Sequence, residues 1–212
     1  MIHLELPLIG PAASVLEAAR TLSRKRDRVA FLFDGNPGVG KSHLADLLAL
    51  EITGSKFAIE RVNGQSLGID TVRDWRERAP YGNLFSPWTV KRIDEIDQAS
   101  GNAIAELLSY LDYMPAKLAV IATTNEYAKL RSMTKGRLET RYVRMNVASP
   151  TVEEVTAYLM RQFKLTKVQA SEIALGSVPE GCLVTEGCNA RAAVEDAAAL
   201  ADLRNTPRRK AA

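Results

Sequence analysis

The sequence predicts an α/β fold, with a three-layer α/β/α domain around a parallel sheet of five strands and a small C-terminal helical domain. Over the first 147 residues, short apolar segments alternate with segments of helical character. Such alternation is typical of a parallel sheet that is covered by helices on both faces. After Pro150 only helical patterns follow. A chain of 212 residues, 46% of them hydrophobic, can bury a core for both parts.

The elements of the sheet domain are predicted in chain order from apolar runs and from periodicity. The expected strands are residues 29–33, 57–62, 88–94, 118–123 and 142–147. The expected helices are residues 12–24, 41–53, 69–79 and 100–112. In the last of these, apolar residues recur at i, i+3, i+4 and i+7, which is the spacing of one helical face. Prolines, glycine, asparagine and serine between residues 80 and 87 predict a loop before the third strand.

The helical domain is expected to begin with a capped helix. Thr151 and Glu154 form a capping-box pattern, which is typical of a helix start. Helical patterns continue to residue 204, with breaks at Pro179 and Gly181. The sequence therefore predicts a core domain over residues 1–149, a helical domain over residues 150–204 and a basic tail over residues 205–212.

A glycine-rich motif lies between the first strand and the helix that follows it. Residues 35–42 match the pattern G-x-x-x-x-G-K-[ST] in full, and this pattern binds nucleotide phosphates. Its glycines let backbone N–H groups surround a phosphate, and the start of the helix adds a partial positive charge. The lysine would contact the β- and γ-phosphates, and the serine hydroxyl would ligate Mg²⁺. The expected nucleotide-binding residues are Gly35, Asn36, Pro37, Gly38, Val39, Gly40, Lys41, Ser42 and His43.

Polar side chains follow two later strands of this P-loop NTPase pattern. Asp94 and Glu95 end the third strand, and Asn125 follows the fourth. In an open parallel sheet, ligands bind at the carboxyl ends of the strands. We expect Asp94 to hold the Mg²⁺ shell and Glu95 to activate the attacking water. Asn125 would orient that water without adding charge.

Taken together, these motifs resemble those of AAA+ ATPases over nearly the whole chain. Residues 35–42 resemble Walker A, Asp94 and Glu95 resemble Walker B, and Asn125 falls at the position of sensor 1. Residues 187–191 resemble sensor 2 of the lid domain, which would make Arg191 a γ-phosphate contact. The resemblance implies ATP and Mg²⁺ as ligands, ATP hydrolysis, and assembly with copies of itself or with homologous AAA+ subunits.

The same resemblance implies an arginine finger, which reaches the nucleotide of a neighbouring subunit. It falls within residues 135–142, where Arg137 and Arg141 are both candidates. Arg137 has the better spacing from Asn125 and is preferred, whereas Arg141 has the better spacing to Pro150.

Residues 62–73 are similar to a segment of clamp-loader subunits that precedes a helix facing DNA. Arg73, Arg76 and Arg78 would then contact phosphates, although a solvated helix of mixed charge explains them equally well. Partners would be DNA and a sliding clamp or another replication protein. The sequence leaves no room for the collar domain of clamp loaders and lacks their Ser-Arg-Cys signature. A protein-remodelling ATPase and an ATP-gated adaptor with little turnover remain alternatives.

Charge and composition add further expectations. The net charge is +3, and basic residues gather within residues 20–28 and 204–212, as phosphate contacts or as solvated ends. Lys91 and Arg92 lie inside the third strand, where they would either pair with acids or face a neighbouring subunit. No apolar run reaches the length of a membrane span, and Cys182 and Cys188 are expected to be reduced. We therefore expect a cytoplasmic protein that does not bind a membrane.

Overall fold

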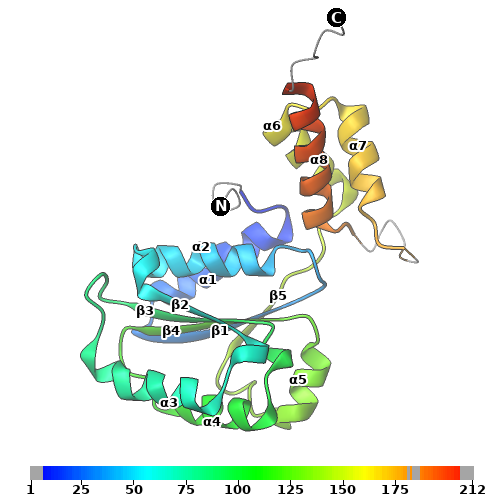
Figure 1. Cartoon of the computed structure of the whole chain (residues 1–212). Coiled ribbons are helices and arrows are strands. Elements are labelled where there is room, and N and C mark those ends of the chain that lie inside the picture. The colour runs from blue at the N-terminus through cyan, green and yellow to red at the C-terminus, as the bar shows by residue number, and fades with distance from the viewer. Residues whose placement is uncertain (1–6, 181, 183–186, 206–212) are drawn as a thin grey trace, which may run out of the picture.

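The computed structural model describes residues 7–180, 182 and 187–205 (Figure 1). Its centre is a sheet of five strands in the order β2-β3-β4-β1-β5, and every neighbouring pair is parallel. The strands are β1 (Arg28–Asp34), β2 (Ile59–Asn63), β3 (Thr89–Asp94), β4 (Leu118–Thr124) and β5 (Val143–Asn146). The predicted parallel sheet is confirmed, and its strand limits differ from the expected ones by at most two residues.

Helices cover both faces of the sheet, so the predicted three layers are confirmed (Figure 1). One layer holds α1 (Pro11–Arg24) and α2 (Lys41–Thr53), and the other holds α3 (Ile69–Arg78), α4 (Gly101–Asp112) and α5 (Tyr127–Thr134). Each layer has its own apolar cluster against the sheet. Helix α5 was not among the predicted helices. Only Leu130 and Thr134 are buried in it, so its apolar periodicity is weak.

The strand order brings the carboxyl ends of the central strands to one edge. β1 pairs with β4 in a register that places Asp34 beside Thr124. β3 lies on the other side of β4, with Ile93 beside Ala122. The segments that follow these three strands therefore emerge together, although they are about 30 to 90 residues apart in the chain.

The C-terminal part consists of α6 (Val152–Phe163), α7 (Lys167–Gly176) and α8 (Ala190–Asn205), which surround a third apolar cluster. The expected capping box is present, because Thr151 and Glu154 each accept a hydrogen bond from the other's backbone N–H. The break between α6 and α7 was not expected. Lys164 there has a left-handed backbone, and Thr166 forms a second capping box with Gln169. Gly181 lies outside the described residues, as do residues 206–212 of the basic tail.

The separate cluster supports our proposal that the chain divides near residues 148–150 into the predicted core and helical domains. One residue of that cluster, Ile9, comes from the segment that precedes α1, so the N-terminal segment also packs against the C-terminal helices. No helix within the described residues is both long enough and apolar enough to cross a bilayer.

Candidate nucleotide site

The glycine-rich motif forms the loop between β1 and α2. Gly38 and Gly40 have φ angles of 81° and 98°, a left-handed conformation that other residues adopt at a cost. A side chain at position 38 would also collide with Asn189, because a Cβ there would lie 2.0 Å from its Oδ1 atom. Glycine at position 38 thus suits both the loop's own turn and its close packing against the Asn189 side chain, which accepts a hydrogen bond from the first turn of α8.

Lys41 is buried at the first position of α2, with 6% of its surface exposed. Its Nζ atom donates hydrogen bonds to the carbonyl oxygens of Gly35, at 2.9 Å, and Asn36, at 2.7 Å. Burial and the nearby positive charge of Arg191 lower the pKa of Lys41 to about 8. The loop thus holds a cation that a phosphate group would stabilise.

The predicted carboxylates and the predicted amide meet at the edge of the sheet. The backbone of Glu95 is left-handed, with φ 51° and ψ 54°, and its N–H donates to Thr123 Oγ1 over 3.2 Å. The same hydroxyl donates to Asp94 Oδ1 over 3.3 Å. Asn125 Nδ2 donates to Glu95 Oε1 over 3.4 Å. Thr123 therefore holds both acidic residues in place, and Asn125 contacts the one expected to activate water.

Asp97 is a further acid at this edge that the sequence reasoning missed. It is 2% exposed, and its Oδ1 atom accepts hydrogen bonds from the hydroxyl of Thr124 and from the backbone N–H of Asn125, the latter over 3.3 Å. These contacts fix the backbone from which Asn125 projects. The position of Asp97, three residues after Asp94, was the signal in the sequence that could have identified it.

The two basic residues inside β3 pair with acids of the same chain. Lys91 pairs with Glu60 on one face of the sheet and lies 5.2 Å from the centre of the Trp75 ring. Arg92 points to the opposite face, where it pairs with Asp94 and donates to the Ser42 carbonyl over 3.0 Å. Of the two explanations left open by the sequence, the structure supports pairing with acids.

A further contact of Arg92 involves Asp46, on the helix that follows the P-loop. Arg92 Nε and Asp46 Oδ1 are 2.8 Å apart, but neither atom meets hydrogen-bond geometry. The contact is therefore an ion pair. Burial raises the pKa of the Asp46 carboxyl, and Arg92 opposes that rise. One buried guanidinium thus links the metal-binding candidate Asp94, at the end of β3, to Ser42 and Asp46 of α2.

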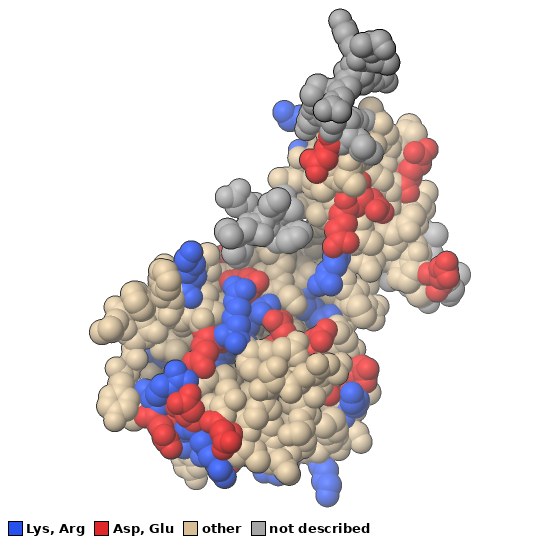
Figure 2. Space-filling view, in the orientation of Figure 1, with Lys and Arg blue, Asp and Glu red and all other residues tan. Residues whose placement is uncertain are grey.

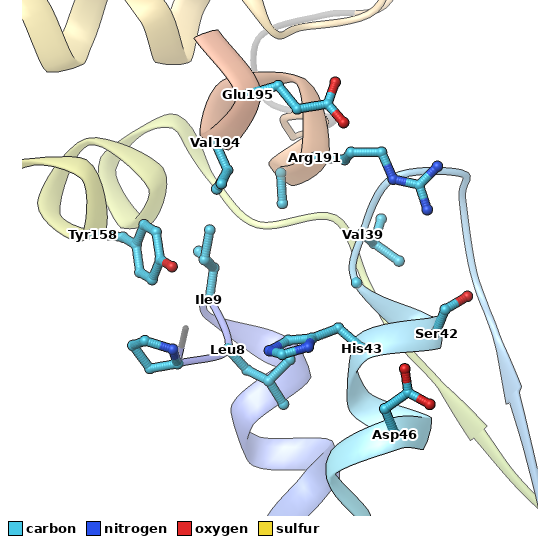
Figure 3. Close-up of a pocket in the computed structure, with 14 residues that line it drawn as sticks. Leu8, Ile9, Val39, Ser42, His43, Asp46, Tyr158, Arg191, Val194 and Glu195 are labelled. Atoms are coloured by element: carbon cyan, nitrogen blue, oxygen red, sulfur yellow. The ribbon is translucent and has the colours of Figure 1, made fainter. Parts of the chain in front are cut away.

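A cavity of about 290 Å³ lies beside the P-loop, between the N-terminal segment and the C-terminal helices (Figure 3). Its apolar side includes Leu8, Ile9, Tyr158 and Val194, and its polar side includes Ser42, His43, Asp46, Arg191 and Glu195. The apolar side was not predicted from the sequence, because those residues come from three distant segments and carry no motif. A cavity of this size and lining can take the base and sugar of a nucleotide.

The remaining candidates are arginines on α8 and on the segment between α5 and β5. Arg191 is in the first turn of α8, where its backbone N–H donates to the Gly38 carbonyl over 3.0 Å. Its exposed side chain extends toward the P-loop (Figure 3). Arg137 and Arg141 lie between α5 and β5. Arg141 is bound by Asp112 through two hydrogen bonds of 2.8 Å, whereas Arg137 is exposed.

Comparisons with known proteins agree with this geometry. A profile of the family described as "ATPase family associated with various cellular activities (AAA)" matches residues 31–145. No curated protein matches the chain. Among solved structures, the RuvB Holliday junction branch migration motor of Thermotoga maritima is similar, with a TM-score of 0.64 and 21% identity over 93% of this chain. A mutant form of that RuvB gives a TM-score of 0.67 at 20% identity, also over 93% of this chain.

A third similar structure is a DNA polymerase III gamma subunit-related protein of Thermotoga maritima. Its TM-score is 0.56 at 15% identity, over 85% of this chain and 70% of that one. The chain spans 63% of the RuvB structure and 64% of the mutant form. At these identities the likeness shows a shared fold.

Proposed function

Since the chain belongs to the AAA family of ATPases, we propose that it binds ATP with Mg²⁺ and hydrolyses it by direct attack of water. The observation that carries the proposal is the convergence of Lys41, Glu95 and Asn125 at one edge of the sheet. Their segments are far apart in the sequence, and a purely structural role would not require a strained, left-handed Glu95 beside a polar amide.

The oxygen ligands at this edge suit Mg²⁺, which prefers carboxylates, hydroxyls and phosphate oxygens. The guanidinium of Arg92 contacts the backbone carbonyl of Ser42 and the carboxylate of Asp94, so these two residues lie within reach of one side chain. We propose that they hold the metal. When bound, Mg²⁺ neutralises charge on the phosphates. Lys41 would leave the carbonyls of Gly35 and Asn36 to contact the same phosphates.

In the proposed reaction, Glu95 accepts the proton of the attacking water, and Asn125 holds that water by its amide. The apolar side of the cavity would exclude bulk water from the base, and Arg191 would contact the γ-phosphate from α8. Its backbone bond to Gly38 ties any movement of α8 to the P-loop.

The proposal predicts different effects at two positions. Glu95→Gln should bind ATP with unchanged affinity and lose at least about 100-fold in hydrolysis rate, because an amide cannot accept the proton. Lys41→Ala should lose ATP affinity itself, because it removes the cation nearest the β- and γ-phosphates. Calorimetry gives the affinities, and phosphate release gives the rates. A Glu95→Gln protein that turns over at the unmodified rate would refute the assignment.

We further propose that subunits of this chain, or homologous AAA+ subunits, assemble so that Arg137 completes the neighbour's site. Arg141 is committed to Asp112 in its own chain. Arg137 is exposed, its guanidinium makes no hydrogen bond or ion pair within the described residues, and it acts on Asp112 only through its charge, so it is available to another subunit. This contrast supports Arg137 as the finger.

We propose that the chain acts on DNA, in replication or repair, as an ATPase of clamp-loader type. This proposal is supported by the resemblance of residues 62–73 and by the printed names of the similar structures, a branch migration motor and a DNA polymerase III gamma-related protein. The basic residues of α3 support it less, because Arg76 pairs with Glu106 at 2.6 Å and Arg78 pairs with Asp74. Figure 2 shows acidic and basic side chains intermixed over this part of the surface.

A sliding clamp or another replication protein remains the proposed protein partner. The loop before β3 exposes large apolar side chains, with 99% of Leu84 and 61% of Phe85 accessible. Exposure on this scale suits contact with another protein. Protein remodelling and nucleotide-gated recruitment remain the alternatives, and intact Glu95 and Asn125 argue against the second.

A further inference from the structure

A continuous series of side-chain contacts runs from the start of the P-loop to the turn that carries Arg137. It begins at Asp34, the last residue of β1, which directly precedes Gly35 and is only 4% exposed. Arg144 of β5 binds this carboxylate through two hydrogen bonds, with Nε at 3.0 Å and Nη2 at 2.8 Å. A bidentate pair of this kind fixes orientation as well as distance.

The next contact leads from β5 to the segment after β4. The guanidinium carbon of Arg144 lies 3.5 Å from the centre of the Tyr127 ring, which is close stacking of a cation on an aromatic face. Tyr127 lies two residues after Asn125, at the first position of α5. The arginine is thereby held between a buried acid and an aromatic ring.

The last contact reaches the turn between α5 and β5. The Tyr127 hydroxyl donates to Glu139 Oε1 over 2.6 Å, and Arg131 Nε lies 2.9 Å from the same oxygen. Partial burial and this hydrogen bond raise the pKa of Tyr127, so its hydroxyl keeps the proton that it donates.

Glu139 and Arg137 share one tight turn. The N–H of Arg137 donates to the Thr134 carbonyl over 3.0 Å, and the N–H of Glu139 donates to the Gly136 carbonyl over 3.1 Å. A shift of Glu139 therefore moves the backbone that carries Arg137. Such successive polar contacts can couple two sites when both bias the same element.

We propose that Asp34, Arg144, Tyr127 and Glu139 position the arginine-finger turn relative to the P-loop of the same subunit. Tyr127 and Arg144 are then positioning residues for hydrolysis in the neighbour. This inference rests on the proposed function, in which Arg137 acts on the adjacent subunit. The Gly35 carbonyl accepts a hydrogen bond from Lys41, and a phosphate would draw Lys41 away from it, so this change at the P-loop would occur one residue from Asp34.

Tyr127→Phe tests the proposal, because it removes only the hydroxyl and keeps the ring under Arg144. Two subunits are mixed. The donor carries Glu95→Gln and can supply only its finger, and the acceptor carries Arg137→Ala and can supply only its catalytic site. Adding Tyr127→Phe to the donor should lower the rate of ATP hydrolysis by the mixture about tenfold, which is the scale of a lost hydrogen bond to a charged group. Adding it to the acceptor should leave the rate unchanged.

The matched control is Tyr113→Phe in the donor. It makes the same chemical change, loss of a tyrosine hydroxyl, at a residue that is 82% exposed. ATP affinity, measured on each variant, should be unaltered by Tyr127→Phe, and the melting temperature should fall by no more than a few degrees. An unchanged rate with the Tyr127→Phe donor, or an equal fall with the acceptor, would overturn the proposal. If the mixture lacking Tyr127→Phe has no activity, the finger assignment itself fails and the inference fails with it.

Discussion

Arg92→Met is the substitution whose outcome the structure constrains most closely. The side chain of Arg92 is 3% exposed, and its guanidinium has three oxygen partners: the Asp46 carboxylate, the Asp94 carboxylate and the Ser42 carbonyl. Methionine fills similar space without charge. The substitution therefore leaves two carboxylates and a carbonyl without their shared partner, and leaves the packing of β3 against α2 largely in place.

The expected loss of folding stability depends on the partners and the water contact that each carboxylate retains. Removing one partner of a buried ion pair costs about 3–5 kcal/mol. The side chain of Asp46 is 19% exposed and keeps Arg61 at 2.9 Å, and that of Asp94 is 28% exposed, so water offsets part of the loss. We therefore expect the lower end, about 3 kcal/mol, which for a chain of this size lowers the melting temperature by roughly 6–12 °C.

The assay is urea denaturation followed by circular dichroism, in which Arg92→Met is compared with Arg61→Met, with Asp46→Leu and with the double substitution. Arg61→Met removes the other partner of Asp46, but that arginine is 49% exposed, so a loss below about 1 kcal/mol is expected. Combining Arg92→Met with Asp46→Leu removes both charges and should restore part of the stability lost with Arg92→Met alone. A cost below about 1 kcal/mol for Arg92→Met, or a double substitution that costs the sum of the two single ones, would refute the reasoning.

Two further predictions concern ligands. Burial and Arg191 lower the pKa of Lys41 from 10.5 to about 8, and bound phosphate should restore its charge, so ATP affinity should be constant below pH 8 and fall above it. Binding at about pH 9 should take up a proton, which calorimetry in buffers of different ionisation enthalpy measures; no uptake, or uptake that persists in Lys41→Arg, would contradict this. On α3, Arg73 is 60% exposed and makes a loose ion pair with Asp70 at 3.8 Å, whereas Arg76 is bound to Glu106. Arg73→Ala should therefore reduce DNA-stimulated hydrolysis and its salt dependence more than Arg76→Ala. If neither substitution changes the stimulation or its salt slope, α3 does not contact DNA.

The sheet and its main helices could be predicted because their signals are local. Helix α2 was predicted to the residue, since a phosphate-binding pattern fixes its start and Gly54, with φ 65°, ends it. Helix α5 could not be found in the same way, because six of its eight positions are not buried and its apolar pattern is correspondingly weak. The break after Phe163 carried a signal that was overlooked, the capping pair Thr166 and Gln169.

Only those residues of the candidate site that belong to a sequence motif could be predicted. Lys41, Asp94, Glu95 and Asn125 were expected from spacing, and the structure brings them to one edge, although their roles remain proposals. The apolar wall of the cavity was not predictable, because Ile9, Tyr158 and Val194 meet only after the C-terminal helices pack. Arg92 was recognised as unusual, but its partners could be identified only from the fold, because Asp46 lies on a different element, far earlier in the chain.

The position of β1 between β4 and β5 has a consequence for synthesis of the chain. Its apolar run, residues 29–33, leaves the ribosome long before either neighbouring strand exists, because β4 ends only at Thr124. At the usual rate of about 5–20 residues per second, the 90 residues between Asp34 and Thr124 take roughly 5–18 s to synthesise. During that interval this apolar strand of the nascent chain has no partner, so it is the segment where a chaperone is expected to bind.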